Sequence, residues 1–105
     1  MAEDLRSISV FPHFKNITAV TTLTEIQLPT VSRMITVGSD AAALYVCTVG
    51  GSDGGAVPAD RAFVPQSQYF SVNTGTGDAN SHSSIYVATQ SGTGDTSIIL
   101  EQNDG

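Results

Sequence analysis

Short runs of alternating apolar and polar residues, separated by segments rich in glycine and aspartate, make up most of the chain. Residues 43–49 give the clearest run. Because apolar residues fall on both of its faces, we expect this strand to lie in the middle of a sheet. Residues 33–37 form a second run just before it. The Gly38-Ser39-Asp40 sequence between them is typical of a tight turn, so the two strands are predicted to form a β-hairpin.

A four-residue motif occurs twice in the last third of the chain. Gly75-Thr76-Gly77-Asp78 and Gly92-Thr93-Gly94-Asp95 each precede an apolar run. Glycine tolerates positive φ and aspartate closes turns with its own side chain, so both copies predict hairpin loops. The strands expected here span residues 84–90 and 95–102.

The remaining segments complete an all-β pattern. Residues 16–28 predict one long bent strand or two short ones, and residues 68–73 predict another strand. Residues 50–62 are so rich in glycine that we expect a long loop, and long loops on small domains commonly contact partners. About seven strands are therefore expected, in a single antiparallel β-sandwich or small barrel that spans residues 15–105.

Residues 1–14 do not alternate cleanly, and Pro12 interrupts any ladder of backbone hydrogen bonds. Two interpretations follow. The segment is either an N-terminal arm that leaves its own core and docks on a partner, or an edge strand folded onto the domain. The docking residues of such an arm would be Leu5, Ile8, Val10, Phe11 and Phe14.

The composition limits the classes of function. The 105 residues are enough for one domain with a modest core. Only 13% of the residues are charged, whereas serine and threonine together number 24, so we expect a hydroxyl-rich surface that docks with little loss of side-chain entropy. The net charge is −6 and the four lysine and arginine residues are scattered, which argues against binding to nucleic acid.

Neither a targeting signal nor a catalytic group is expected. The acidic start of the chain argues against a signal peptide, and no apolar run is long enough for a transmembrane helix, so no membrane association is expected. Cys47 is the only cysteine and falls within an apolar strand, so we expect a buried structural thiol and not a nucleophile. His13 and His82 lack further ligands at a spacing that indicates zinc.

Two binding chemistries remain open, although we expect no cofactor. The first is calcium, because four aspartates fall in glycine-containing loops, where each also has a sufficient explanation as a turn former. These are Asp40, Asp53, Asp78 and Asp95. The second is carbohydrate, for which exposed tyrosines could serve as platforms, although packing within the sheets explains two of them more simply. The tyrosines are Tyr45, Tyr69 and Tyr86.

Three segments carry a resemblance to known proteins: TEIQLP at residues 24–29, MITVGSDAAALYV at residues 34–46 and SIYVATQSG at residues 84–92. In the residue pattern along its predicted strands, over roughly residues 20–101, the chain resembles small virion structural proteins of tailed bacteriophages, especially marine ones. Such proteins are compact β domains that decorate or cement a capsid lattice, or build fibres and tail parts. The resemblance implies a non-enzymatic virion protein made in the host cytoplasm. Its partners would be the major capsid protein or other virion proteins, and it would form a homo-oligomer or lattice-bound multimer.

A cement protein bridges neighbouring shell subunits, so that several modest contacts act together as one avid attachment. We expect these contacts to come from the N-terminal arm and from the loop at residues 50–61, which includes Asp53 and Arg61. Arg33 and Arg61 are expected to contact carboxylates at the rim of the interface, with a local intrachain salt bridge as the alternative. The competing hypothesis is a receptor- or glycan-binding tip domain of a tail or fibre, whose Gly-Asp loops would form the contact surface.

Overall fold

The computed structural model describes residues 2–29, 34–73 and 84–101, and the regular structure within these ranges consists of β-strands. The strands are β1 (Glu3–Asp4), β2 (His13–Ala19), β3 (Thr24–Gln27), β4 (Met34–Gly38), β5 (Leu44–Cys47), β6 (Ala62–Val64), β7 (Tyr69–Asn73), β8 (Ser84–Thr89) and β9 (Gly94–Glu101). Within these ranges, no helix is long and apolar enough to cross a lipid bilayer.

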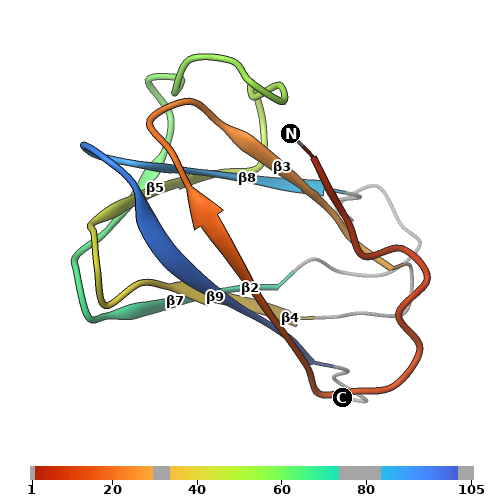
Figure 1. Ribbon diagram of the computed structural model, residues 1–105. Coiled ribbons are helices and arrows are strands. Elements are labelled where there is room, and N and C mark those ends of the chain that lie inside the picture. The colour runs from red at the N-terminus through yellow and green to blue at the C-terminus, as the bar shows by residue number, and fades with distance from the viewer. Residues whose placement is uncertain (1, 30–33, 74–83, 102–105) are drawn as a thin grey trace.

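The strands form two sheets that face each other, one with the order β1-β3-β8-β5-β6 and the other with the order β2-β9-β4-β7 (Figure 1). Four antiparallel pairs are nested around the connection between β5 and β6: β2 with β9, β3 with β8, β4 with β7, and β5 with β6. Further pairing of β4 with β9 and of β5 with β8 joins them into sheets. This is the strand order of a jelly roll, an eight-stranded double-sheet fold, with β1 added in parallel to the edge strand β3.

The two sheets enclose one hydrophobic core. In β9, Ile98 and Leu100 are buried while Ile99 between them is only half-buried, as the two-residue period of a strand requires. The inward-facing residues of the other strands are also mainly branched aliphatic side chains: Ile17, Ile26, Ile35, Val37, Leu44, Val46, Val64, Ile85 and Val87. The predicted all-β sandwich is therefore confirmed, and the described residues contain nine strands where about seven were expected. The two missed strands, β1 and β6, are too short to produce a periodic signal.

The predicted hairpin between residues 33–37 and 43–49 is wrong. β4 and β5 belong to different sheets, and the segment between them carries the chain from one sheet to the other. Ser39 organises this crossing. Its Oγ accepts hydrogen bonds from the N–H groups of Ala41 (3.1 Å) and Ala42 (3.2 Å) and donates one to the backbone carbonyl of Asp95 (2.6 Å). β5 is nevertheless central, as predicted, because β6 and β8 flank it.

The hairpin predicted at residues 92–95 is also a crossing, from β8 in one sheet to β9 in the other. Gly94 permits a close approach here, because a Cβ on it would lie 2.9 Å from the Cβ of Ala42. The other copy of the motif, residues 75–78, lies outside the described residues. Residues 16–28 take the second of their two alternatives, since two separate strands occur here: β3 lies within this range, and β2 begins three residues before it.

For the N-terminal segment, the structure agrees with the interpretation of a strand folded onto the domain. β1 pairs with β3, and the Leu5 N–H donates a hydrogen bond to the Gln27 carbonyl (2.9 Å). The Leu5 side chain is only 5% exposed, and Ile8 and Phe11 pack against the same core. The segment thus runs from one sheet to the other along one side of the sandwich (Figure 1).

Candidate functional site

The predicted arm residues differ widely in exposure. Val10 is 77% exposed and Phe14 is 67% exposed on the outer face of β2, whereas Ile8 and Phe11 are half-buried against the core. Leu5 is a core residue, so its prediction as a partner-binding residue needs correction: its side chain offers no surface to a partner. We call Val10 and Phe14 the N-terminal surface.

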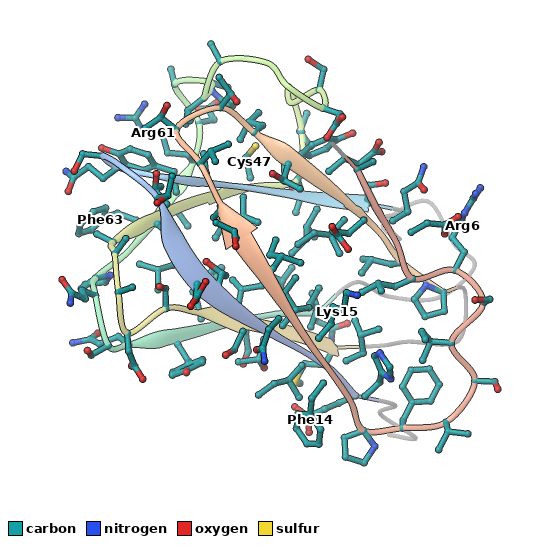
Figure 2. All side chains as sticks on the ribbon, in the orientation of Figure 1. Arg6, Phe14, Lys15, Cys47, Arg61 and Phe63 are labelled. Carbon is teal, nitrogen blue, oxygen red and sulfur yellow. The ribbon has the colours of Figure 1, made fainter. Side chains whose placement is uncertain are left out.

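A second exposed apolar surface lies where the edge strands β6 and β7 face each other across the open side of the sandwich. A groove of about 430 Å³ opens here, lined by apolar side chains together with Thr48, Asp60, Arg61 and polar residues of β7. Its apolar lining consists of Val46, Cys47, Ala62, Phe70 and Val72. Phe63 of β6 is 50% exposed and Phe70 of β7 is also exposed. Phe63 does not line the groove, because it lies on the opposite face of β6 from Ala62. We call the groove together with the adjoining Phe63 the edge surface; Phe63 and Phe14 lie well apart (Figure 2).

Arg61 makes two contacts within its own chain, while its predicted contact with a carboxylate at the rim of an interface stays a prediction. Its guanidinium lies over the Tyr45 ring, 4.4 Å from the ring centroid, and its Nη1 donates to the Pro58 carbonyl (3.3 Å). The Tyr45 ring in turn lies beside Phe63, with 5.8 Å between the ring centroids. An exposed cation–π contact contributes about 0.5–1 kcal/mol, and this one covers a face of the Tyr45 ring. Arg33 lies outside the described residues.

Asp53 holds the long loop against the domain. Its carboxylate accepts a hydrogen bond from the Glu25 N–H (3.0 Å). Beside it, the Gly54 N–H donates to the Leu23 carbonyl (2.7 Å), and the Leu23 N–H donates to the Gly55 carbonyl (2.9 Å). These bonds place Asp53 in a fixed loop, so its carboxylate has a structural role in addition to any contact with a partner.

This loop covers part of the outer face of the β1-β3-β8-β5-β6 sheet and creates a small second core. Leu23, Cys47 and Ala88 are buried there, with Val57 and Tyr86 packed around them. Burial raises the pKa of the Cys47 thiol, which favours the protonated form over the nucleophilic thiolate. The prediction of a buried thiol is confirmed.

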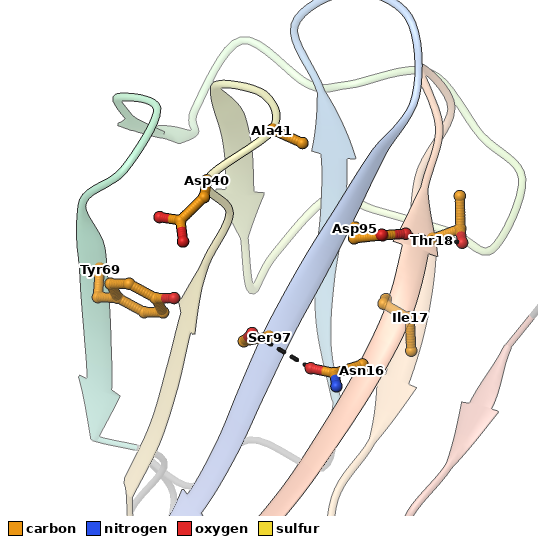
Figure 3. Close-up of a pocket in the computed structure, with 8 residues that line it drawn as sticks. All are labelled: Asn16, Ile17, Thr18, Asp40, Ala41, Tyr69, Asp95 and Ser97. Atoms are coloured by element: carbon orange, nitrogen blue, oxygen red, sulfur yellow. Dashed lines mark hydrogen bonds between the residues drawn. The ribbon is translucent and has the colours of Figure 1, made fainter.

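The outer face of the β2-β9-β4-β7 sheet carries an open depression of about 560 Å³ (Figure 3). Residues far apart in sequence line it: Asn16, Ile17, Thr18, Asp40, Ala41, Tyr69, Asp95 and Ser97. The register explains the convergence, because Asn16 pairs with Ser97 and Thr18 pairs with Asp95. The Tyr69 ring extends from β7 across β4 on the same face.

Gly38 makes this arrangement possible. It pairs with Tyr69 across β4 and β7 and with Ser97 across β4 and β9. A Cβ on Gly38 would lie 2.6 Å from the Cγ of Tyr69 and 2.6 Å from the Gln68 carbonyl oxygen. The missing side chain therefore lets the Tyr69 ring lie across the sheet and leaves the space beside it open.

The polar groups of the depression are partly ordered by one another. The Ser97 Oγ donates to the Asn16 Oδ1 (3.2 Å), and the Thr18 Oγ1 makes a long contact with the Asp95 Oδ1 (3.5 Å). The Asp40 backbone carbonyl accepts a hydrogen bond from the Gln66 side chain (2.7 Å), which ties down the loop that carries this aspartate. The depression thus presents carboxylate, amide and phenol groups around an aromatic ring.

The structure brings together two of the four loop aspartates, Asp40 and Asp95, while Asp53 lies elsewhere and Asp78 is outside the described residues. Across the described ranges, no group of three or more histidine, cysteine, aspartate or glutamate side chains could hold a metal ion. Calcium binding at the Gly-Asp loops remains a prediction without a site among these residues.

Of the three tyrosines, only Tyr69 lines the depression. Tyr45 lies beneath Arg61, and the Tyr86 hydroxyl donates to the Glu25 carboxylate (3.4 Å). Sequence reasoning missed Asn16, Thr18 and Ser97 as site residues. Their outward positions follow from strand alternation, but the antiparallel register of β2 and β9 is needed to place them side by side.

No protein-family model matches the chain, and no curated protein or solved structure shows significant similarity to it.

Proposed function

We propose that the chain is a non-enzymatic virion structural protein that decorates or cements a phage capsid by bridging shell subunits. The observation that carries this proposal is the presence of exposed apolar side chains on two separate sides of one small domain. These are the N-terminal surface, with Val10 and Phe14, and the edge surface around Phe63 and Phe70. A protein that bridges two neighbours needs at least two such surfaces.

The edge surface is suited to a protein partner because β6 and β7 end their sheets. Edge strands present unpaired backbone N–H and C=O groups that can pair with a strand of another chain. The other long edge strand, β2, is protected, since the inward-facing Lys15 Nζ lies 3.9 Å from the Glu3 carboxylate across the side of the sandwich. β7 instead carries the exposed Phe70 beside an apolar groove. A strand of the major capsid protein or of another virion protein fits this edge.

The fold supports the same role by analogy only. Jelly rolls are common in viral capsid proteins, but they also occur in lectins and in enzymes, so topology alone does not assign a function. The low proportion of charged residues lowers the cost of desolvation on docking and adds to the support.

The experiment is quantitative peptide mass spectrometry of purified particles, with the copy number of this chain measured against the major shell protein. A ratio equal to the lattice count, or to a simple fraction of it, is the expected result. A handful of copies per particle would favour a tail or fibre part, and absence from particles would overturn the proposal.

Single-surface variants then test the bridging mechanism. Phe14→Thr and Phe63→Thr each remove one exposed ring and put in its place a β-branched residue, which is well suited to a strand. Each should weaken attachment to particles about ten- to hundredfold, because burial of a phenylalanine contributes about 1.5–3 kcal/mol. Val20→Thr, at an exposed apolar position between β2 and β3, serves as the matched control. Full attachment of both phenylalanine variants would contradict the two-surface mechanism.

A second candidate is a receptor- or glycan-binding tip domain of a tail or fibre. The specific observation that favours it is the depression beside Tyr69, which neither of the two apolar surfaces includes. The copy number in purified particles distinguishes the two candidates, because a tip domain is present in only a handful of copies whereas a cement protein is present at the lattice count or a simple fraction of it.

A further inference from the structure

We infer that the depression on the outer face of the β2-β9-β4-β7 sheet binds a neutral saccharide. The inference does not depend on the proposed capsid role, because the depression uses residues outside both apolar surfaces. Its volume of about 560 Å³ lies within the roughly 300–1,000 Å³ that is usual for small-molecule sites.

Tyr69 supplies the platform. Tyr69 is 50% exposed. Because Gly38 has no side chain, the Tyr69 ring can extend across the sheet (Figure 3). An amphipathic ring of this kind has an apolar face that can cover the C–H face of a pyranose, while its hydroxyl stays available for hydrogen bonding. The other two tyrosines are engaged with Arg61 and Glu25 and cannot play this part.

The polar groups around the ring match the hydroxyl groups of a saccharide, each of which both donates and accepts. The Asn16 Oδ1 is engaged by the Ser97 Oγ, so the amide is held with its NH₂ group left to donate. The carboxylates of Asp40 and Asp95 accept. Asp40 lies on the Tyr69 side of the depression, whereas Asp95 and Asn16 lie on β9 and β2 (Figure 3). A ligand over the middle of the sheet therefore meets donors and acceptors from opposite sides.

The charge of the lining selects the class of saccharide. Asp40 and Asp95 are acidic, and the other lining residues are neutral, with neither lysine nor arginine among the eight. A sialylated, sulfated or phosphorylated ligand would bring a negative charge beside two carboxylates without a cation to balance it. The phosphates of a nucleotide would meet the same two carboxylates, so neutral saccharides are the best match.

The test uses the full chain on a glycan array that contains both neutral and anionic glycans, followed by titration of the best neutral glycan in solution. Binding of a neutral glycan is the expected result. In the unmodified protein, the backbone amide signals of Asn16, Asp95 and Ser97 should shift on titration. An array that retains only anionic glycans, or no glycan, would overturn the inference, and so would shifts confined to other parts of the chain.

Matched aromatic variants locate the site. Tyr69→Ser should weaken binding at least roughly tenfold, whereas Phe63→Ser, at an equally exposed aromatic position on the edge surface, should leave it unchanged. Tyr69→Phe keeps the platform and should retain most of the affinity, and Asp40→Asn keeps the shape but removes the charge and should weaken binding. Equal effects of Tyr69→Ser and Phe63→Ser would contradict the assignment. The copy number in virions is independent of these results.

Discussion

Replacement of Leu5 by alanine tests directly whether the N-terminal segment belongs to the folded domain. Leu5 is 5% exposed and lies in the same core cluster as residues from both sheets. A detachable arm would lose nothing when this side chain is shortened. In the structure, by contrast, the change leaves a cavity between the N-terminal segment and the core.

The size of the effect follows from the position of Leu5. Leucine-to-alanine changes in protein cores cost about 2–5 kcal/mol, and the cost increases with the volume of the cavity that remains. Leu5 lies at the side of the sandwich, beside the half-buried Ile8 and Phe11, which can move into part of the space. We therefore expect a loss of about 2–3 kcal/mol, near the lower end of this range. For a domain of this size, the loss lowers the melting temperature by about 10–20 °C.

The assay is urea unfolding followed by circular dichroism, with thermal melts in parallel. Val10→Ala is the control, because Val10 is in the same segment but 77% exposed. It should change the free energy of unfolding by less than about 0.5 kcal/mol. If Leu5→Ala were as stable as Val10→Ala, the segment would not be packed in solution, and the hypothesis of a detachable arm would be correct.

Three further outcomes are expected. In an NMR pH titration, the Asp4 carboxyl should show a pKa of about 2 instead of its usual 3.8, because hydrogen bonds from Arg6 stabilise the charged form. Arg6→Gln should return the Asp4 pKa toward the usual value. An unchanged low pKa in this variant would refute the assigned cause. Since the folded-state pKa is depressed, this pair stabilises the fold above pH 3.8 and its contribution is lost as the pH falls through 2, a small effect because both groups are exposed. Cys47 should react with a thiol reagent far more slowly in the folded protein than in urea, because it is buried and its pKa is raised; equal rates would show that the covering loop is open. Asp53→Ala should lower the free energy of unfolding by about 1 kcal/mol and speed proteolysis within residues 50–61, because the Glu25 N–H loses its hydrogen-bond partner. An unchanged rate of proteolysis would show that other contacts hold the loop.

Local signals along the chain located most of the strands well. Residues 84–90 and 95–102 were predicted as strands, and β8 and β9 differ from these ranges by one residue at the ends that the structure describes. Each strand alternates between a buried and an outer face, so its apolar period is visible in a single sequence. β1 and β6 escaped because two or three residues do not establish a period.

The candidate site was less visible. Tyr69, Asp40 and Asp95 were recognised as chemically suitable residues, but nothing in the sequence placed them together. Asn16 and Ser97 are 81 residues apart and meet only because β2 pairs with β9. A contact between strands so distant in sequence depends on the register of the whole sheet.

The sequence by itself determined that the chain is an all-β domain, where its turns fall and which strand is central, because these properties depend on local periodicity and turn chemistry. Only the tertiary structure decided which strands pair. The turns at residues 38–40 and 92–95 are compatible both with a hairpin and with a crossing between sheets, and the choice depends on how completely the apolar faces of all the strands can be buried together. Nesting the strand pairs into a jelly roll buries those faces and brings Tyr69, Asp40 and Asp95 to one depression. The pairing of β1 with β3 then places Leu5 in the core.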